Sequence, residues 1–168
     1  MKDEAKNKLG QILGAYDEKL AEIDRREAAS RAAQAAFPER FATLRTRTIR
    51  PVIEEFADVL NGRGHQATAR EQEESSSTVG GVLSAAISLR IIPRPFVHKS
   101  TDTNKSFIEI TFSANRNERK ITVSSTNTMT ASVGNLGKRG EYELDAVTAD
   151  VVAEHVLQIL QEALAPAR

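Results

Sequence analysis

The sequence predicts an α+β fold in which helices come first, an antiparallel sheet follows, and one helix closes the chain. Two changes in the spacing of apolar residues indicate this order. Apolar residues follow a helical period up to about residue 60, alternate with polar residues from about 67 to 147, and return to a helical period over 151–164. A period near 3.6 is typical of a helix with one buried face, and a period of 2 is typical of a half-buried strand.

Length and composition limit the class of protein. The chain has 168 residues, 23 Lys plus Arg against 23 Asp plus Glu, and no Cys. This length is typical of one compact domain, here with one extended element. Zero net charge argues against a polyelectrolyte that is drawn to nucleic acid or to an anionic membrane. The absence of Cys excludes disulfides and thiol nucleophiles. The longest apolar stretch, 82–89, is too short to span a bilayer, so we expect a cytoplasmic protein without membrane contact.

The first predicted helix, residues 1–36, carries a short heptad seam with charged residues on both flanks. Its members alternate at spacings of four and three residues, and they are Leu9, Leu13, Tyr16, Leu20 and Ile23. This spacing is typical of a coiled coil. The seam stops where Glu27 and Ser30 occupy the next two positions. We therefore expect the helix either to pack on its own domain or to project and form a homodimer with a second copy.

A second helix is expected to begin the compact region of residues 37–168. Pro38 suits the first turn of this helix, where no backbone N–H is needed. Pro51 lies inside the apolar pattern and should kink or divide the helix. Gly62 is expected to end the helix in a left-handed conformation. The sequence thus predicts two N-terminal helices that meet at an angle near Phe37.

Five stretches of alternating apolar residues predict an antiparallel meander. The expected strands lie at 64–73, 83–91, 107–113, 120–124 and 141–146. Each has one apolar face, which is typical of a sheet that is covered on one side only. The opposite face is rich in Ser and Thr, and Phe107 and Ala86 on that face hint at a partner surface.

The closing helix is expected to pack its apolar stripe against the covered face of the sheet. Thr148 should cap the helix, because a threonine side chain can accept a hydrogen bond from the first turn. The stripe consists of Val151, Val152, Val156, Ile159, Leu160 and Leu164. We expect Ile159 and Leu160 at the centre of the contact with the sheet.

The second helix also carries an arginine face, formed by Arg40, Arg47 and Arg50, with Arg45 nearby. Arginine faces can contact phosphates. They are more often solvated or paired with acidic residues of their own chain, such as Glu54. The face is therefore a candidate for weak contact with a polyanion such as nucleic acid.

Further basic residues lie near the ends of the predicted strands. They are Arg90, Arg94, His98, Lys99, Lys105, Arg116, Arg119, Lys120, Lys138 and Arg139. A site for single-stranded nucleic acid would need aromatic platforms among these charges, and only Phe96 and Phe107 are candidates.

The sequence assigns no catalytic residue, no cofactor and no metal ligand. His65, His98 and His155 lack the spacing of a helical metal pair, so we expect them to be structural or exposed. The glycine-rich stretch 133–140 contains a Lys, as phosphate-binding loops do, but a strand is expected after it, whereas a phosphate-binding loop precedes a helix. We interpret this stretch as the connection between the last two strands.

Three functions are therefore compatible with the sequence. The favoured one is a non-enzymatic scaffold or adaptor that self-associates through its N-terminal helix and holds a protein partner of unknown identity. The second is a nucleic-acid-associated accessory protein that uses the arginine face. The third is a small-ligand binder or hydrolase with a pocket between the sheet and the closing helix.

Overall fold

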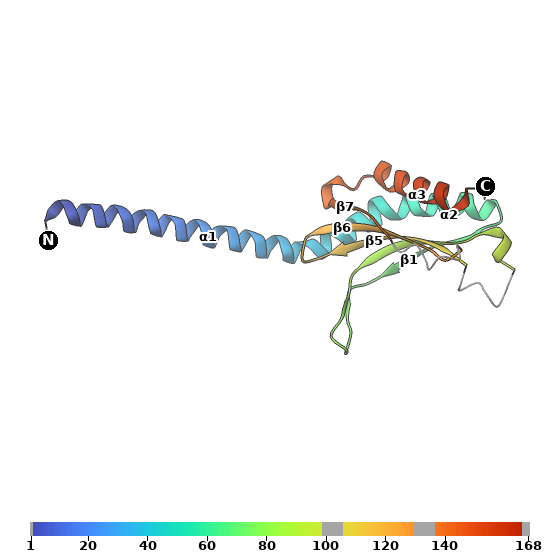
Figure 1. Cartoon of the computed structure of the whole chain (residues 1–168), viewed down its shortest axis with the longest axis horizontal. Coiled ribbons are helices and arrows are strands. Elements are labelled where there is room, and N and C mark those ends of the chain that lie inside the picture. Colours follow the sequence, from blue (N-terminus) through green and yellow to red (C-terminus); the bar gives the residue numbers. More distant parts are fainter. Residues whose placement is uncertain (1, 99–105, 130–136, 166–168) are drawn as a thin grey trace. The chain divides into compact units, whose positions relative to one another are not determined.

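A computed structural model describes residues 2–98, 106–129 and 137–165 of the chain. The chain divides into two compact units, Met1–Ala36 and Phe37–Arg168. Figure 1 shows the order of elements: helices first, then an antiparallel sheet, then a closing helix. The α+β class, the antiparallel sheet and the C-terminal helix are confirmed.

The first unit consists of helix. Helix α1 spans Asp3–Leu44, so most of it forms this unit and its last turns belong to the second unit. Asp3 and Glu4 lie in its first turn, where carboxylates interact favourably with the helix dipole. The alanines that follow the seam keep the helix propensity high up to Ala36.

The predicted start of a second helix at Pro38 is wrong, because α1 continues through Pro38 to Leu44. Phe37 and Phe41 lie one turn apart and are both buried in the core of the second unit. We attribute the continuous helix to this burial, which offsets the backbone hydrogen bond that Pro38 cannot make.

The expected division of the helix occurs at Pro51. A π-helical turn, η1, spans Arg45–Ile49, and helix α2 follows at Arg50–Gly62. The backbone N–H of Arg50 donates to the carbonyl of Arg45, which closes the wider turn. Pro51 lies in the first turn of α2, where a missing N–H is tolerated.

The left-handed residue after α2 is Gly64 and not Gly62. Gly64 has a φ of +89°, whereas Gly62 is the last helical residue. The N–H of Gly64 donates to the carbonyl of Asn61 at 3.1 Å. The Asn61 side chain in turn donates to the carbonyl of Ala67 at 3.0 Å and accepts from its N–H at 2.8 Å. Asn61 therefore ties the end of α2 to the first strand.

The five-stranded sheet is antiparallel throughout and has the order β1-β4-β5-β6-β7. Its strands are β1 Gln66–Gln72, β4 Ala86–Ile92, β5 Ile108–Asn115, β6 Lys120–Asn127 and β7 Gly137–Glu143. Between β1 and β4 the chain forms a separate two-stranded ribbon, of β2 (Ser75–Ser76) and β3 (Val82–Leu83). Figure 1 shows this ribbon extending away from the sheet. The predicted meander is thus confirmed, with one insertion.

The second predicted strand is divided in the structure. Leu83 was expected to face the core, but it belongs to the ribbon and is exposed. Ser84 and Ala85 separate β3 from β4, so the chain leaves the sheet before it reaches Leu83.

The last strand also differs from the prediction. Gly137–Gly140 was expected in the connection but forms the first part of β7. Leu144–Ala146 forms a 3-10 turn, η3, in which Leu144 is buried and Ala146 is exposed. The rest of the predicted connection, residues 133–136, lies outside the described residues.

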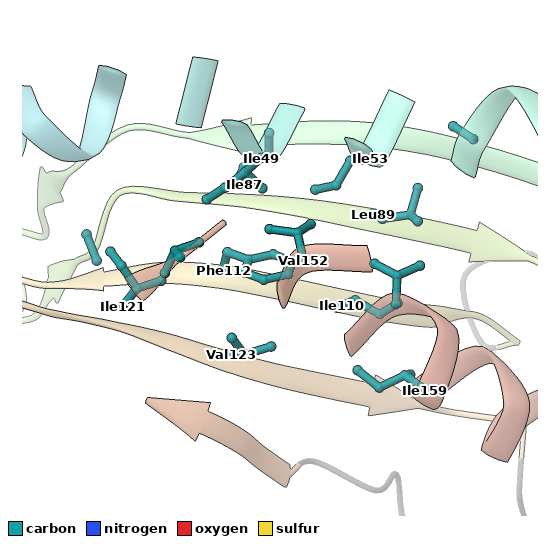
Figure 2. Close-up of a cluster of buried hydrophobic side chains, with 14 of the residues drawn as sticks. Ile49, Ile53, Ile87, Leu89, Ile110, Phe112, Ile121, Val123, Val152 and Ile159 are labelled. Atoms are coloured by element: carbon teal, nitrogen blue, oxygen red, sulfur yellow. The ribbon is translucent and has the colours of Figure 1, made fainter. Parts of the chain in front are cut away.

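Helices α2 and α3 (Ala149–Leu164) cover one face of the sheet, and the core lies between the two layers (Figure 1). Figure 2 shows this core, which includes Ile49, Ile53, Ile87, Leu89, Ile110, Phe112, Ile121, Val123, Val152 and Ile159. Every second residue of β5 is buried, as the period of 2 predicts.

Helix α3 begins at its predicted cap, since the Thr148 side chain accepts a hydrogen bond from the N–H of Val151 at 3.3 Å. Its buried face is narrower than predicted. Ile159 is buried, Leu160 is half-buried and Leu164 is exposed. His155 is buried on this face, although its position in the sequence did not suggest a core residue.

Candidate interaction surfaces

The seam forms one apolar stripe on α1. Leu9, Leu13, Tyr16, Leu20 and Ile23 are 41–57% exposed. Ile12, beside the stripe, is 65% exposed. The first unit taken by itself is a single helix, so it contains no second layer that could cover these side chains. Contiguous apolar surface of this kind is typical of an interaction site.

Charged side chains border the seam, and one pair is satisfied within the helix. Arg26 donates to Glu22 at 2.6 Å, one turn away. Lys19 and Asp24 have no ion pair within the part of the chain that the structure describes. These two charges therefore remain available to a partner of the helix.

The arginine face is largely occupied by contacts within the second unit. Arg40 donates to Asp145 in η3 at 2.9 Å. Arg50 forms an ion pair with Glu71 in β1 and a longer one, 3.9 Å, with Glu54. Arg47 is exposed and has no ion pair among the described residues. Two of the three arginines thus meet carboxylates on different elements, and this weakens the case for a polyanion site.

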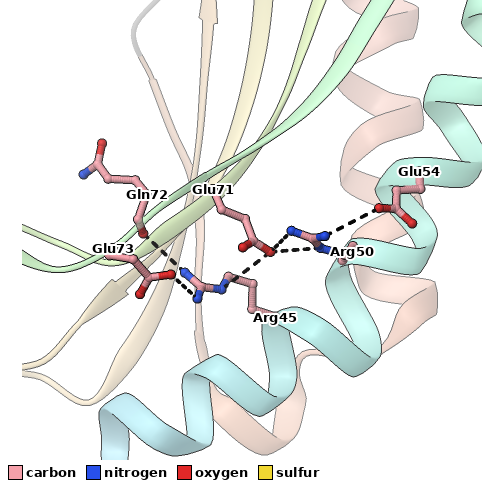
Figure 3. Close-up of polar contacts among 6 residues, drawn as sticks. All are labelled: Arg45, Arg50, Glu54, Glu71, Gln72 and Glu73. Atoms are coloured by element: carbon pink, nitrogen blue, oxygen red, sulfur yellow. Dashed lines mark hydrogen bonds and ion pairs between the residues drawn. The ribbon is translucent and has the colours of Figure 1, made fainter.

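Arg45 is the most buried charged residue among the described residues of the second unit, with 6% of its surface exposed. Figure 3 shows its guanidinium reaching from η1 to the end of β1. There it donates to the carbonyl of Gln72 at 3.3 Å and to the carboxylate of Glu73 at 2.6 Å. Its Nε makes no hydrogen bond but lies 3.8 Å from the Glu71 carboxylate. The guanidinium also lies 5.8 Å from the centre of the Phe41 ring.

This arginine–carboxylate cluster, formed by Arg45, Arg50, Glu71 and Glu73, joins the helical segment to the edge strand β1. Carboxylates and carbonyls stabilise a buried guanidinium, and here they bind both terminal nitrogens of Arg45. We therefore interpret the cluster as a structural link. The sequence reveals Arg45 but not its partners, which lie far along the chain.

The outer face of the sheet is polar, and no described helix packs on it. A hollow of about 330 Å³ lies there, lined by Arg70, Gln72, Ser88, Glu109 and Thr111 among others. Ser88 donates to Glu109 at 2.8 Å, so part of its polar surface is already used. Small-molecule pockets are mostly apolar and enclose their ligand. The lining of this hollow is mainly polar, which is not typical of such a pocket.

Phe107 does not offer a flat, open ring for stacking. The Arg90 guanidinium lies over it, 3.8 Å from the ring centre. The other hint of a partner surface, Ala86, is buried on the outer face. Neither aromatic side chain considered for nucleic acid offers a fully open ring on which a base could stack, since Phe107 is covered and Phe96 is half-buried.

Several of the predicted basic residues near strand ends have acidic partners. Arg116 pairs with Glu74 at 3.1 Å. Arg139 pairs with Glu162 of α3 at 2.7 Å. Lys99 and Lys105 lie outside the described residues. Part of the basic charge at the strand ends is thus neutralised by carboxylates of the same chain.

Lys138, Glu141 and Glu118 form a small polar network at the β7 side of the outer face. Lys138 donates to Glu141 at 2.8 Å, and this bond lowers the pKa of Glu141 and raises the pKa of Lys138. A hydrogen bond with Glu141 raises the pKa of Glu118. Lys138 and Glu118 are exposed and Glu141 is half-buried, so the network is a surface feature.

The histidines occupy structural or exposed positions. The ring Nδ1 of His65 accepts the N–H of Arg94 at 3.0 Å, and His98 is exposed. His155 lies 2.5 Å from the Tyr142 hydroxyl, atom to atom, and burial lowers its pKa. Among the described residues, no group of three or more side chains is placed to hold a metal ion.

The described part of the chain contains no helix that is both long and apolar enough to cross a membrane. A comparison of the chain with family models, with curated proteins and with solved structures found no match in any of the three. Of the surfaces of the molecule, the seam on α1 is the clearest candidate for an interaction site.

Proposed function

We propose that the protein is a non-enzymatic interaction module, a scaffold or adaptor, that self-associates through the seam on α1. The proposal includes a cytoplasmic location, as the sequence led us to expect, and a protein partner that is held by the second unit. The exposed stripe from Leu9 to Ile23 carries the proposal.

The apolar stripe gains stability when a partner removes it from water. An isolated helix gains little from its own propensity and is stabilised mainly by packing of its apolar face. Each seam side chain that is fully removed from water contributes roughly 1.5–3 kcal/mol. Association itself costs about 4–15 kcal/mol. A short seam therefore supports a dimer of moderate affinity, which is suited to reversible assembly.

The second unit supports the non-enzymatic part of the proposal. Its buried charged group, Arg45, is committed to the link with β1. Its buried histidine, His155 of α3, contacts Tyr142 of β7 at the edge of the core. Neither arrangement combines a nucleophile with a base that faces an open pocket, which is what covalent catalysis requires.

Sedimentation equilibrium of the intact protein tests the proposal. We expect a dimer for the unmodified chain and a monomer for the double variant Leu13→Asp/Leu20→Asp. The matched control is Ala15→Asp/Ala21→Asp, which adds the same charge to the same helix outside the seam and should stay dimeric. Circular dichroism checks that each variant stays helical. A monomeric unmodified protein at high concentration contradicts the proposal.

A further inference from the structure

We infer that two copies of α1 pair in parallel and in register, with Lys19 of each copy facing Asp24 of the other. This inference rests on the proposed self-association and names the arrangement of its partner, a second copy of the chain.

The spacing of the seam allows only one heptad assignment. In the heptad abcdefg, the step from a to d is three residues and the step from d to a is four. Leu9 is followed by Leu13 four residues later, so Leu9 occupies a d position and Leu13 an a position. The remaining seam residues then alternate as d, a and d, and they are Tyr16, Leu20 and Ile23.

This assignment places opposite charges on the two flanks of the seam. The e positions hold Gly10, Asp17 and Asp24, and the g positions hold Ile12, Lys19 and Arg26. One flank is therefore acidic or neutral, and the other is basic or apolar. Residues at e and g form the salt bridges between helices that set partner choice and orientation.

A parallel pair brings each g position to the e position of the following heptad on the partner. Lys19 then faces Asp24 of the second copy, and the twofold symmetry repeats this pair. An antiparallel pair brings e to e and g to g. Within the seam, that arrangement has no oppositely charged pair on either flank, because the charged e residues are both Asp and the charged g residues are basic.

Among the described residues of a single chain, neither Lys19 nor Asp24 has an ion pair. The residues four positions from Lys19 are Ala15 and Ile23, and those four positions from Asp24 are Leu20 and Ala28. Glu22 lies three residues after Lys19, but its carboxylate is bound to Arg26. Neither charge can therefore form the helical i, i+4 pair that stabilises many exposed charges. By contrast, Arg26 already has its intrahelical partner Glu22. The charges that a parallel partner would use are thus the ones that remain unpaired.

Parallel pairing has a functional consequence for the dimer. It brings the two copies of Ala36 to the same end of the paired helices, where each chain continues into its second unit. Two binding surfaces that are joined in this way can engage a repeated or dimeric partner with higher avidity than either surface alone.

Cysteine cross-linking of the full chain tests the orientation, because the natural sequence contains no Cys. We expect Leu9→Cys and Ile23→Cys each to form a disulfide-linked dimer with itself under oxidised glutathione. The matched control is Gln11→Cys, which places the thiol on the outer f position and should not cross-link. Cross-linking only in a mixture of the two seam variants would show an antiparallel pair and overturn the inference.

A charge reversal gives an independent test that does not depend on thiol chemistry. Asp24→Lys places like charges together in a parallel pair and should raise the dimer dissociation constant by roughly three- to tenfold. Lys19→Asp added to it should restore the affinity. In an antiparallel pair, Asp24→Lys would meet Asp17 and tighten the dimer, which overturns the inference.

Sedimentation of the reduced proteins separates the two proposals. A dimer whose cross-links or charge response are antiparallel overturns only the orientation. A protein that stays monomeric under all conditions overturns the self-association and the orientation together. This outcome includes a seam that packs on its own chain or on a different protein.

Discussion

Ile159→Ala tests how strongly helix α3 is held against the sheet. Ile159 is 2% exposed and lies in the core that Figure 2 shows, among Ile110 and Val152. Truncation of a buried Ile costs about 2–5 kcal/mol, through lost transfer free energy and the cavity that remains. A typical domain is stable by about 5–15 kcal/mol, so the loss is a large fraction of the total. We expect urea denaturation to show a lower midpoint with an unchanged slope.

The same helix provides a matched control for this measurement. Leu157 is 57% exposed, and Leu157→Ala removes a side chain of the same size from the opposite side of α3. We expect this variant to change the unfolding free energy by no more than about 0.5 kcal/mol. Leu160→Ala, at a half-buried position, should fall between the two. Equal effects of Ile159→Ala and Leu157→Ala would show that α3 is not docked as described.

Two further predictions concern the buried polar groups. Arg45→Ala should lower the unfolding free energy by about 1–3 kcal/mol, because it removes the hydrogen bonds to Gln72 and Glu73. Arg47→Ala, at an exposed site, should leave the unfolding free energy unchanged. Equal denaturation midpoints for the two variants would contradict the structural role of Arg45. Burial lowers the pKa of His155, so the unfolded chain binds a proton at a higher pH than the folded chain does. The free energy of unfolding should therefore fall as the pH drops below about 6.5. Thermal unfolding at pH 7.5 and 5.5 should show this loss in the unmodified protein and a smaller one in His155→Phe; an equal loss in both would assign the effect to other groups.

The sheet was predictable because its signal is local and repeats. In β5 the buried residues Ile108, Ile110 and Phe112 alternate with half-buried ones. The three buried residues all lie on the same face of the sheet. When apolar residues alternate over such a stretch, a half-buried strand is one of the few structures that bury all of them on one face. The cap at Thr148 was predictable for a similar reason, since the capping contact spans only three residues.

The interruptions of the helices were harder to place, because a distant contact overrides a local rule. Pro38 and Pro51 look alike in the sequence, and each is compatible with the first turn of a helix. Of these two, only Pro51 lies in the first turn of a helix in the structure. The difference lies in Phe37 and Phe41, which must stay on one helical face to reach the core formed by the second unit. Nothing near Pro38 in the sequence shows where that core will be.

Arg45 illustrates why part of the candidate site could not be predicted. A regular helix repeats every 3.6 residues, and on that repeat Arg45 is one member of an arginine-rich surface. The π-helical turn Arg45–Ile49 widens the repeat and changes the directions of the side chains that follow it. The partners are Gln72, at the far end of β1, and Glu73, which follows it, so their position depends on the sheet. An arginine face read from helical spacing alone therefore overestimates the charge that remains for a polyanion. This error does not affect the seam on α1 in the same way. Its helix continues without interruption from Asp3 past Ile23, and the heptad positions depend only on the regular repeat of that helix.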